Sequence, residues 1–375
     1  MRFVHIADLH LGKWIHQYSL LDIQKELLSE LLEYMDEQDI RLLIIAGDVY
    51  DRLIPSLEAV NVLDEFLSQA MLKYHIEVMM ISGNHDSSDR LHFASSILDK
   101  SGLHIETYLK KNMVFYQKEQ TRFYLLPFVK PSHVRNIYSE CDAKTYQEAL
   151  EYYLSKQSLD HNYQNVLITH QFVGHQSITS DSELPVSLGG SEVLTASLFD
   201  DFDYVALGHL HAPQYVTRET IRYSGSLMAY SFDEVKQRKS ITIVDTKDWS
   251  IDEYILHPSY TLKKYKGTFE KFSQIDFIEK KDDLLSFELE DEMIVPHAME
   301  QLRVLYPRLL QVTYSFLTRQ KETIQKTYSL DIQKSNPLEL FEEFYQDVKN
   351  QELSSVQKEM MQELLEKAGV IREDS

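Results

Sequence analysis

Carboxylates, an amide and imidazoles follow five apolar runs of the sequence, each at the point where a β-strand would end. In chain order, these side chains belong to Asp8, His10, Asp48, Asn84, His85, His170, His209 and His211. The runs themselves are FVHIA (3–7), RLLIIAG (41–47), IEVMMIS (76–82), NVLITH (165–170) and DYVALGHLH (203–211). Because the carboxyl ends of the strands in an open α/β sheet line one crevice, we expect all five groups to meet there.

Side chains of these types are suited to binding divalent metal ions. Oxygen and nitrogen donors without sulfur suit Mn²⁺, Fe²⁺, Zn²⁺ or Mg²⁺. Two such ions about 3.5–4 Å apart, bridged by a carboxylate, clamp the attacking and leaving oxygens of a phosphoryl group. Taken singly, each residue has another interpretation: His10 or His170 as a hydrogen-bonded structural histidine, Asp51 as a helix N-cap, and Asp86 as a local cap or turn residue. The joint pattern predicts a metal centre that acts on phosphate esters.

Composition narrows the function classes further. The chain has 375 residues, of which 43% are apolar, so it can form a real core and more than one domain. Its 59 acidic and 38 basic residues give a formal net charge of -21, which argues mildly against a protein that coats DNA. An enzyme acting on nucleic acid remains compatible with this charge, because bound cations decide the local field.

The remaining bulk features indicate a cytoplasmic protein. A single cysteine, Cys141, excludes an internal disulfide and a thiolate zinc site, which fits a reducing cytosol. No apolar run approaches the roughly 18 residues needed to span a bilayer. The N-terminus leads directly into a strand that meets Asp8, so we expect no secretory signal.

Strands and helices alternate along the first part of the chain. Apolar residues at helical spacing predict helices over 19–38, 56–73 and 144–157, and a hairpin is expected over 113–118 and 121–128. Further strands are expected at 221–226 and 240–246. Strand, helix and strand in succession, with strands that are apolar throughout, predict an α/β fold whose parallel or mixed sheet is covered by helices.

The sequence changes in character near His257. The runs TLKKYKGTFEKF, LLSFELED and LLQVTYSF look like strands, and the helix-like run HAMEQLRVLY lies between the last two. They predict a small α+β domain over about 259–320. LELFEEFYQDV and VQKEMMQELLEKAG then predict two amphipathic helices in an αα-hairpin, with apolar residues including Leu338, Phe341, Phe344, Tyr345, Met360, Met361 and Leu364. This apolar face either binds a partner or folds back on its own chain.

Five of the motifs carry a resemblance to a known family. D-x-H, G-D-x-x-D, G-N-H-D, a lone histidine after a strand and G-H-x-H resemble the signature of calcineurin-like metallophosphoesterases, over most of residues 1–230. HIADLHLGK, AGDVYD, ISGNHDS, GHLHAPQ, YSGSLMAYSFDE and NPLELFEEFYQ resemble the DNA nuclease subunits within that family. The resemblance implies a sheet sandwich flanked by helices, followed by a small α+β capping domain and a C-terminal helical hairpin.

The resemblance also implies a role for each residue. Asp8, His10 and His211 would hold one metal, Asn84, His170 and His209 the other, and Asp48 would bridge the two. The cofactors implied are two divalent ions, Mn²⁺ first, with Mg²⁺, Fe²⁺ or Zn²⁺ as the other choices. His85 would stabilise the transition state or protonate the leaving oxygen, which suits an imidazole next to the ligand Asn84. Asp51 would orient His85, and Arg52 would contact the substrate phosphate.

A function and a set of partners follow from the same resemblance. It implies a metal-dependent DNA nuclease, both a double-strand 3′–5′ exonuclease and a single-strand or hairpin endonuclease, in DNA repair, recombination and replication. The sequence has no G-x-x-x-x-G-K-[ST] motif, so we expect the chain not to bind ATP through a P-loop. The resemblance implies that ATP belongs to a partner, an SMC-like ATPase. The alternatives are a small-molecule phosphodiesterase or phosphatase on the same metal site, and a scaffold whose metal site is vestigial.

Three domains are expected on this basis. Residues 1–257 would form the nuclease domain, which would also make a homodimer to which the helix at 19–38 contributes. Residues 258–335 would form the capping domain, and residues 336–375 would bind the coiled coil of the ATPase. The lysines of the capping domain either contact DNA phosphates or form an ordinary solvated face: Lys263, Lys264, Lys266 and Lys271.

Overall fold

The computed structural model describes residues 1–174, 183, 192–274, 282–317, 338, 341–342, 345–346, 351 and 353–367. The chain divides into two compact units. The first comprises Met1–Lys264, Glu279–Ser286 and Tyr306–Leu310, and the second comprises Tyr265–Ile278, Phe287–Leu305 and Gln311–Ser375. Over the described residues, every helix is too short or too polar to cross a bilayer.

The first unit contains two six-stranded mixed sheets. One has the order β14-β13-β1-β4-β5-β6, in which β1, β4, β5 and β6 are parallel and β13 and β14 are antiparallel. Its strands are β1 (Arg2–Ile6), β4 (Leu42–Ala46), β5 (Glu77–Ile81), β6 (Leu103–Glu106), β13 (Ile241–Asp245) and β14 (Ser250–Tyr254). The predicted parallel succession of the first three strands is therefore confirmed.

The second sheet has the order β11-β12-β10-β9-β8-β7. Strands β8, β9, β10 and β12 run parallel, and β7 and β11 are antiparallel edge strands. The bounds are β7 (Val114–Lys118), β8 (Thr121–Leu126), β9 (Gln164–His170), β10 (Tyr204–Gly208), β11 (Gln214–Val216) and β12 (Arg218–Tyr223). The expected hairpin of β7 and β8 is present, at the edge of this sheet.

The two sheets pack face to face, and the period of two in their strands explains the layers. In β4, Leu42, Ile44 and Ala46 belong to the core between the sheets, whereas Leu43 and Ile45 belong to the core on the outer face. All five residues are buried, and full burial of each large aliphatic side chain contributes about 1.5–3 kcal/mol. A strand buried on both faces reads as a continuous apolar run, which is how the sequence shows it.

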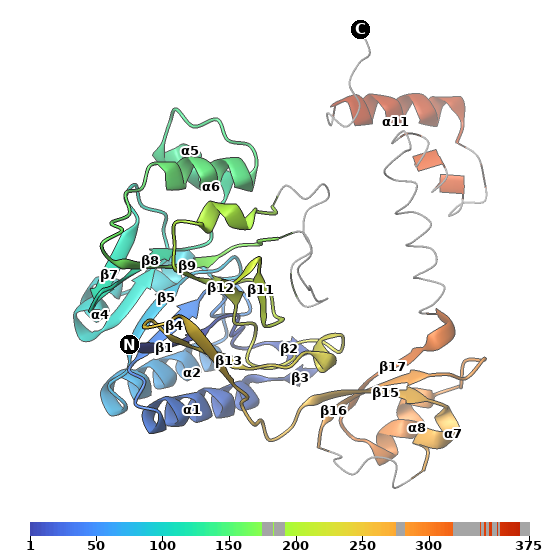
Figure 1. Ribbon diagram of the computed structural model, residues 1–375. Helices are drawn as coiled ribbons and strands as arrows, with labels where there is room; N and C mark the ends of the chain where they lie inside the picture. Colours follow the sequence, from blue (N-terminus) through green and yellow to red (C-terminus); the bar gives the residue numbers. More distant parts are fainter. Residues whose placement is uncertain are drawn as a thin grey trace. The chain divides into compact units, whose positions relative to one another are not determined.

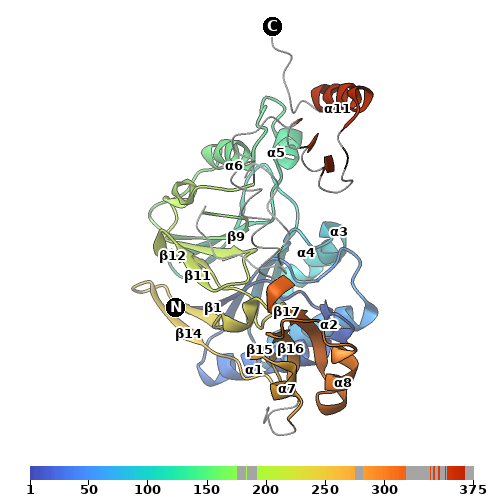
Figure 2. The ribbon, with the colours of Figure 1, turned by 90° about the vertical axis from the view of Figure 1, so that its right-hand side faces the viewer.

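Helices cover both outer faces of this sandwich. The helices α1 (Leu21–Glu37) and α2 (Leu57–Ser68) lie on the first sheet, and α5 (Pro131–Ile137) and α6 (Tyr146–Ser155) lie on the second (Figure 1). The same order of layers is visible when the molecule is turned (Figure 2). The apolar stripe of α1 is buried in the core of its own unit: Ile23, Leu27, Leu28, Leu31, Leu32 and Met35.

Several short elements were not expected from the sequence. They are β2 (Trp14–Ile15), β3 (Tyr18–Ser19), α3 (Ser88–His92), α4 (Ser95–Leu98), η2 (Asp99–Ser101), η3 (Ala196–Phe199) and η4 (Glu234–Lys236), together with β6, β11, β14 and α5. The helix expected over 56–73 is α2 continued by one π-helical turn, η1 (Gln69–Lys73). Short elements carry too few residues to show a periodic pattern, so their absence from the prediction has a simple cause.

A three-stranded sheet follows, in the order β15-β16-β17. Its strands β15 (Leu262–Gly267), β16 (Leu284–Leu289) and β17 (Leu309–Tyr314) are accompanied by α7 (Phe269–Phe272) and α8 (Ala298–Leu305). The run TLKKYKGTFEKF was expected to be strand-like throughout, and this is wrong for its end. Thr268 follows the strand and caps α7, because its hydroxyl accepts a hydrogen bond from the N–H of Lys271 at 3.3 Å.

The C-terminal segment is described only in part. Helix α11 (Ser355–Lys367) is present, whereas much of the first helix expected near 338–348, including Phe344, lies outside the described residues. Within the second unit, Lys358 forms an ion pair with Glu342 at 2.8 Å, and Gln357 donates a hydrogen bond to the hydroxyl of Tyr345 at 3.2 Å. These contacts join α11 to the described residues of the preceding helical segment.

Candidate dinuclear metal centre

The ends of β1 and β4 bring the first ligand-type residues together. The N–H of Asp8 donates to the carbonyl of Gly47 at 3.1 Å, and the N–H of His10 donates to the carbonyl of Asp48 at 3.0 Å. The backbone φ is +54° at Asp8, +43° at His10 and +49° at Asp48. Non-glycine residues in this region of φ cost about 1–3 kcal/mol each, and such strain clusters at functional sites. The local backbone is held in this form so that the side chains point into the site.

Asp48 lies at the centre of the cluster. Its Oδ2 atom is 3.7 Å from Nε2 of His10 and 3.4 Å from Nε2 of His170. Its Oδ1 atom accepts a hydrogen bond from the N–H of His85 at 2.9 Å. This carboxylate therefore faces a histidine that follows β1 on one side and a histidine that ends β9 on the other, which is the position of a bridging ligand.

Two groups of donors flank Asp48. On one side, Nε2 of His10 and Nε2 of His211 are 3.1 Å apart, and one atom of the Asp8 carboxylate lies within 4.8 Å of them. On the other side, Oδ1 of Asn84 lies 2.9 Å from Nε2 of His170 and 3.1 Å from Nδ1 of His209. The structure thus brings together all seven residues expected to bind metal.

Hydrogen bonds behind the ring fix the orientation of two imidazoles. Nδ1 of His170 donates to the carbonyl of Ala46 at 2.9 Å, and Nδ1 of His211 donates to the carboxylate of Glu234 at 3.0 Å. The Nε2 atoms of both rings therefore present lone pairs to the site, as in metal-binding histidines. Among the described residues, the buried Nδ1 of His10 has no hydrogen-bond partner. Nitrogen atoms as close together as Nε2 of His10 and Nε2 of His211 are suited to binding one cation between them.

Burial and neighbouring charges shift the pKa values of the two buried carboxylates in opposite directions. Burial raises the pKa of Asp8 well above its ordinary value. Burial also opposes ionisation of Asp48, but the charge of His170 beside it outweighs this effect and lowers the pKa of Asp48. Burial disfavours the charged form of His170 as well, yet Asp48 raises the pKa of His170 to about 9. A bound dication would supply the counter-charge for both carboxylates, so the residues fit divalent metal ions.

His85, Asp51 and Arg52 lie beside the donor cluster. Nδ1 of His85 donates to the main-chain carbonyl of Asp51 at 3.0 Å, and the ring of His85 packs edge-on against His10 with centroids 4.8 Å apart. The carboxylate of Asp51 forms an ion pair with Lys13 at 2.8 Å. Asp51 therefore contacts His85 through its main-chain carbonyl and not through its carboxylate. The side chain of Arg52 is 74% exposed and 3.7 Å from Asp51.

Asp86 has the local structural role that the sequence suggested. Its buried carboxylate accepts hydrogen bonds from the N–H groups of Val49 at 3.1 Å, Tyr50 at 2.9 Å and Gly83 at 2.9 Å. It therefore joins the loop after β4 to the loop after β5. Since these loops carry Asp48 and Asn84, Asp86 helps to keep the two side chains in place.

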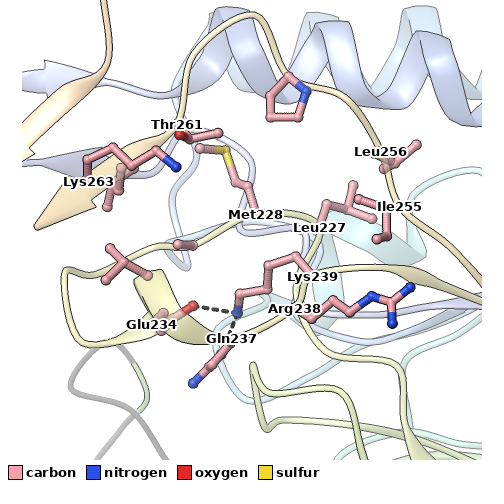
Figure 3. Close-up of a pocket in the computed structure, with 14 residues that line it drawn as sticks. Leu227, Met228, Glu234, Gln237, Arg238, Lys239, Ile255, Leu256, Thr261 and Lys263 are labelled. Atoms are coloured by element: carbon pink, nitrogen blue, oxygen red, sulfur yellow. Dashed lines mark hydrogen bonds and ion pairs between the residues drawn. The ribbon is translucent and has the colours of Figure 1, made fainter. Parts of the chain in front are cut away.

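Glu234 and Lys239 are functional residues that the sequence did not reveal. The Glu234 carboxylate, which is fully buried, accepts from His211 at 3.0 Å and pairs with the ammonium of Lys239 at 2.6 Å. Lys239 also donates to the carbonyl of His211 at 2.7 Å and the hydroxyl of Ser226 at 2.8 Å. Figure 3 shows this pair on the wall of a cavity of about 250 Å³ whose other lining includes Leu227. The pair lies in an irregular segment without periodicity, and its one sequence signal is its position within and just after YSGSLMAYSFDE.

We expect the substitution Glu234→Gln to weaken metal binding by about 10–100-fold, because the partner of a ligating histidine fixes its tautomer and raises its basicity. Titration of the metal-free protein with Mn²⁺, followed by calorimetry, measures this. Glu30→Gln is the matched control. Glu30 also accepts a hydrogen bond from Nδ1 of a histidine, His257, at 2.8 Å, but neither residue is a candidate metal ligand. Equal Mn²⁺ affinity in the Glu234→Gln and Glu30→Gln variants would contradict the role of Glu234.

Gly208, at the end of β10, lies against the backbone at the end of β4 in the other sheet. A Cβ atom added there would lie 1.9 Å from the carbonyl oxygen of Ala46 and 2.7 Å from Nδ1 of His170. Since these are backbone and ligand atoms that cannot move aside, we expect Gly208→Ala to lower the free energy of unfolding by about 3 kcal/mol. Gly267→Ala, whose Cβ would meet only the flexible Lys271 side chain at 3.3 Å and the ring of Phe272, should change it by less than about 1 kcal/mol. Urea denaturation of both variants measures the difference, and similar midpoints would refute it.

Two sheets that converge carboxylates, an amide and imidazoles on one buried point define a metal-dependent phosphoesterase. The comparison with known families agrees: residues 1–213 match the model of the calcineurin-like phosphoesterases, and the chain belongs to this family. It is accordingly a hydrolase that binds divalent metal. Residues 260–349 match a second model, described as the type 5 capsule protein repressor C-terminal domain.

The chain is similar over its whole length to one curated protein in particular. It is 33% identical over 371 residues to the SbcD subunit of the nuclease SbcCD from Staphylococcus epidermidis, and the match covers 97% of this chain and 98% of the relative. The resemblance inferred from the motifs is thus confirmed.

Solved structures show weaker likeness. A dimetal phosphatase from Danio rerio is 12% identical and covers 65% of this chain and 91% of its own, with a TM-score of 0.37. A protein of Thermus thermophilus is 9% identical and covers 68% and 99%, with a TM-score of 0.39.

Proposed function

We propose that this chain is the nuclease subunit of an SbcCD-type complex. It would cut DNA as a double-strand 3′–5′ exonuclease and as a single-strand or hairpin endonuclease, in DNA repair, recombination and replication. The observation that carries the proposal is the convergence of six candidate metal-binding side chains on a seventh, Asp48, in a chain that matches a nuclease subunit over 97% of its length.

The metal ligands are assigned from the two groups that flank Asp48. Asp8, His10 and His211 hold one ion, and Asn84, His170 and His209 hold the other, with Asp48 shared between them. We propose Mn²⁺ as the ion in both positions, since carboxylate, amide and imidazole donors suit it. When bound, the ions polarise the phosphate and stabilise the charge that develops on its oxygens.

His85 supplies the proton for the leaving group. Its Nδ1–H donates to the carbonyl of Asp51, so Nε2 is the atom that can carry a proton toward the substrate. The hydrogen bond from its N–H to Asp48 keeps it beside the donor cluster, where its ring packs edge-on against His10. From Nε2, an imidazolium can donate a proton to the 3′-oxygen as that oxygen leaves. The exposed Arg52 is placed to meet a substrate phosphate.

A small-molecule phosphodiesterase or phosphatase is the second candidate, because the metal centre alone would serve either substrate. The test is digestion of blunt and hairpin DNA with Mn²⁺, beside hydrolysis of a chromogenic phosphodiester. Our proposal requires cleavage of DNA with a far higher kcat/KM than that of the chromogenic diester. Rapid hydrolysis of the small diester without DNA cleavage would favour the second candidate.

The remaining domains are assigned to DNA and to the ATPase partner. We propose that residues 1–257 are the nuclease domain, 258–335 the capping domain and 336–375 the segment that binds the coiled coil of an SMC-like ATPase of SbcC type. Three apolar side chains at helical spacing on α11 are exposed, by 63% at Val356, 61% at Met360 and 56% at Leu364, and suit a helix-on-helix interface. Truncation after residue 335 should abolish co-elution with that ATPase.

Two finer points concern DNA and the dimer. In the proposed capping domain, Lys266 is paired with Glu288 at 2.9 Å, so DNA phosphates would have to compete for its ammonium.

For a homodimer of the nuclease domain, the stripe of α1 is already buried in its own core, whereas Leu53, Ile54 and Leu57 are exposed by 59–72%. We therefore propose that the segment before and at the start of α2 forms the dimer contact.

A further inference from the structure

An aromatic cavity begins at the second group of candidate ligands. It has a volume of about 280 Å³, and its wall includes Asn84 and His209. Beyond these two residues the lining includes three aromatic rings, those of Phe128, Tyr146 and Phe172. The cavity therefore joins the candidate metal centre to a surface rich in aromatic side chains.

Two of the three rings pack against imidazoles of the centre, and the third packs against one of these two rings. The ring of Phe128 lies edge-on to His170 with centroids 6.2 Å apart, and the ring of Phe172 lies edge-on to His209 at 5.9 Å. Tyr146 is tilted against Phe128 at 6.2 Å. Phe128 and Tyr146 are partly exposed, and both line the cavity, so aromatic surface remains there to contact a ligand.

The polar groups of the cavity nearly balance in charge. Its lining carries one cation, Lys130, one carboxylate, Glu192, and the amide of Gln171. The ammonium of Lys130 lies 6.0 Å from the centroid of Phe128. A cavity with one positive and one negative group does not select a second phosphate. Its aromatic surface instead suits a flat and uncharged ring that can stack.

We propose that this cavity binds the base of the nucleotide whose phosphate lies at the metal centre. This inference rests on the proposed function, which places a DNA phosphate beside Asn84 and His209. A deoxynucleotide carries its base one sugar away from its phosphate, and the cavity starts at the ligands and extends away from them over aromatic rings. Stacking of a base on aromatic side chains is tolerant of sequence, as a nuclease of broad substrate range requires.

The test compares two probes that differ only in the base. The binding of dAMP and of 2-deoxyribose 5-phosphate to the Mn²⁺-loaded protein is measured by calorimetry. We expect dAMP to bind at least about tenfold more tightly, since one stacked base is worth about that factor or more. In the double variant Phe128→Leu/Tyr146→Leu, this preference should fall below about threefold, with unchanged affinity for 2-deoxyribose 5-phosphate.

Controls separate loss of the cavity from loss of the fold or of the proposed function. Tyr215→Leu, which removes a 55% exposed ring in β11, should keep the full preference for dAMP. Equal affinity for both probes in the parental protein, or an unchanged preference in the double variant, would overturn the inference. Cleavage of hairpin DNA with Mn²⁺ tests the proposed function separately. Its absence would count against the proposed function, while the preference for dAMP would still show whether the cavity binds a base.

Discussion

Substitution of Asp48 by asparagine should remove both metal binding and nuclease activity. Asp48 is buried, and its Oδ2 atom faces His10 at 3.7 Å and His170 at 3.4 Å, so this carboxylate faces both groups of donors. Asparagine keeps the shape but removes the negative charge that a bridging position requires. We expect kcat/KM on DNA to fall by at least about 10³-fold. Metal analysis by mass spectrometry should fall from about two ions per chain to fewer than one.

The matched control for this experiment is Asp39→Asn. Asp39 also adopts a positive φ, +53°, but its side chain is 86% exposed and pairs only with Arg41 among the described residues. It should retain the parental metal content and rate. If the Asp48→Asn protein bound two ions and cut DNA like the Asp39→Asn protein, Asp48 would not be a metal ligand.

Replacement of His85 by alanine should separate metal binding from catalysis. The ring of His85 packs against His10, and its Nδ1 donates to the carbonyl of Asp51, so in our assignment it lies beside the ligands and is not one of them. We therefore expect the variant to keep its metal content and to lose about 10²–10⁴-fold in kcat, the usual worth of a general acid. Single-turnover cleavage of a hairpin DNA measures the chemical step directly.

A second readout distinguishes a general acid from a structural residue. With a leaving group as acidic as p-nitrophenol, protonation is no longer needed, so His85→Ala should lose much less activity on such a diester than on DNA. His161→Ala, an exposed histidine outside the site, should leave both rates unchanged. An equal loss on both substrates, or the parental rate on DNA, would show that His85 does not protonate the leaving oxygen.

The ligand set was predictable because two independent regularities coincide in it. Strands buried on both faces, such as β4 and β9, are visible as continuous apolar runs, and polar residues directly after such runs must lie at the carboxyl edge of the sheet. The resulting set of Asp8, Asp48 and His170 lies together in the structure. The length of α1 was also predictable, because seven buried positions repeat at helical spacing.

Residues that hydrogen-bond to the candidate ligands from outside the metal site could not be predicted in this way. Glu234 and Lys239 lie in an irregular segment, and only the folded chain brings their side chains to His211. The contact of Asp51 with His85 runs through a main-chain carbonyl, which no side-chain pattern encodes. The aromatic cavity is likewise assembled from the segments that follow β8 and β9 and from the start of α6, which share no common sequence signal.

The proposed ligand residues come from two different sheets, and this has a thermodynamic consequence. Asp8, Asp48 and Asn84 follow strands of the first sheet, whereas His170 and His209 lie at the ends of strands of the second. Each bound cation would therefore be coordinated by residues of both sheets. Its binding free energy would add to the free energy of unfolding. Removal of the cations by EDTA should therefore lower the melting temperature. Melting curves with and without EDTA would show whether the protein carries metal ions before any substrate is added.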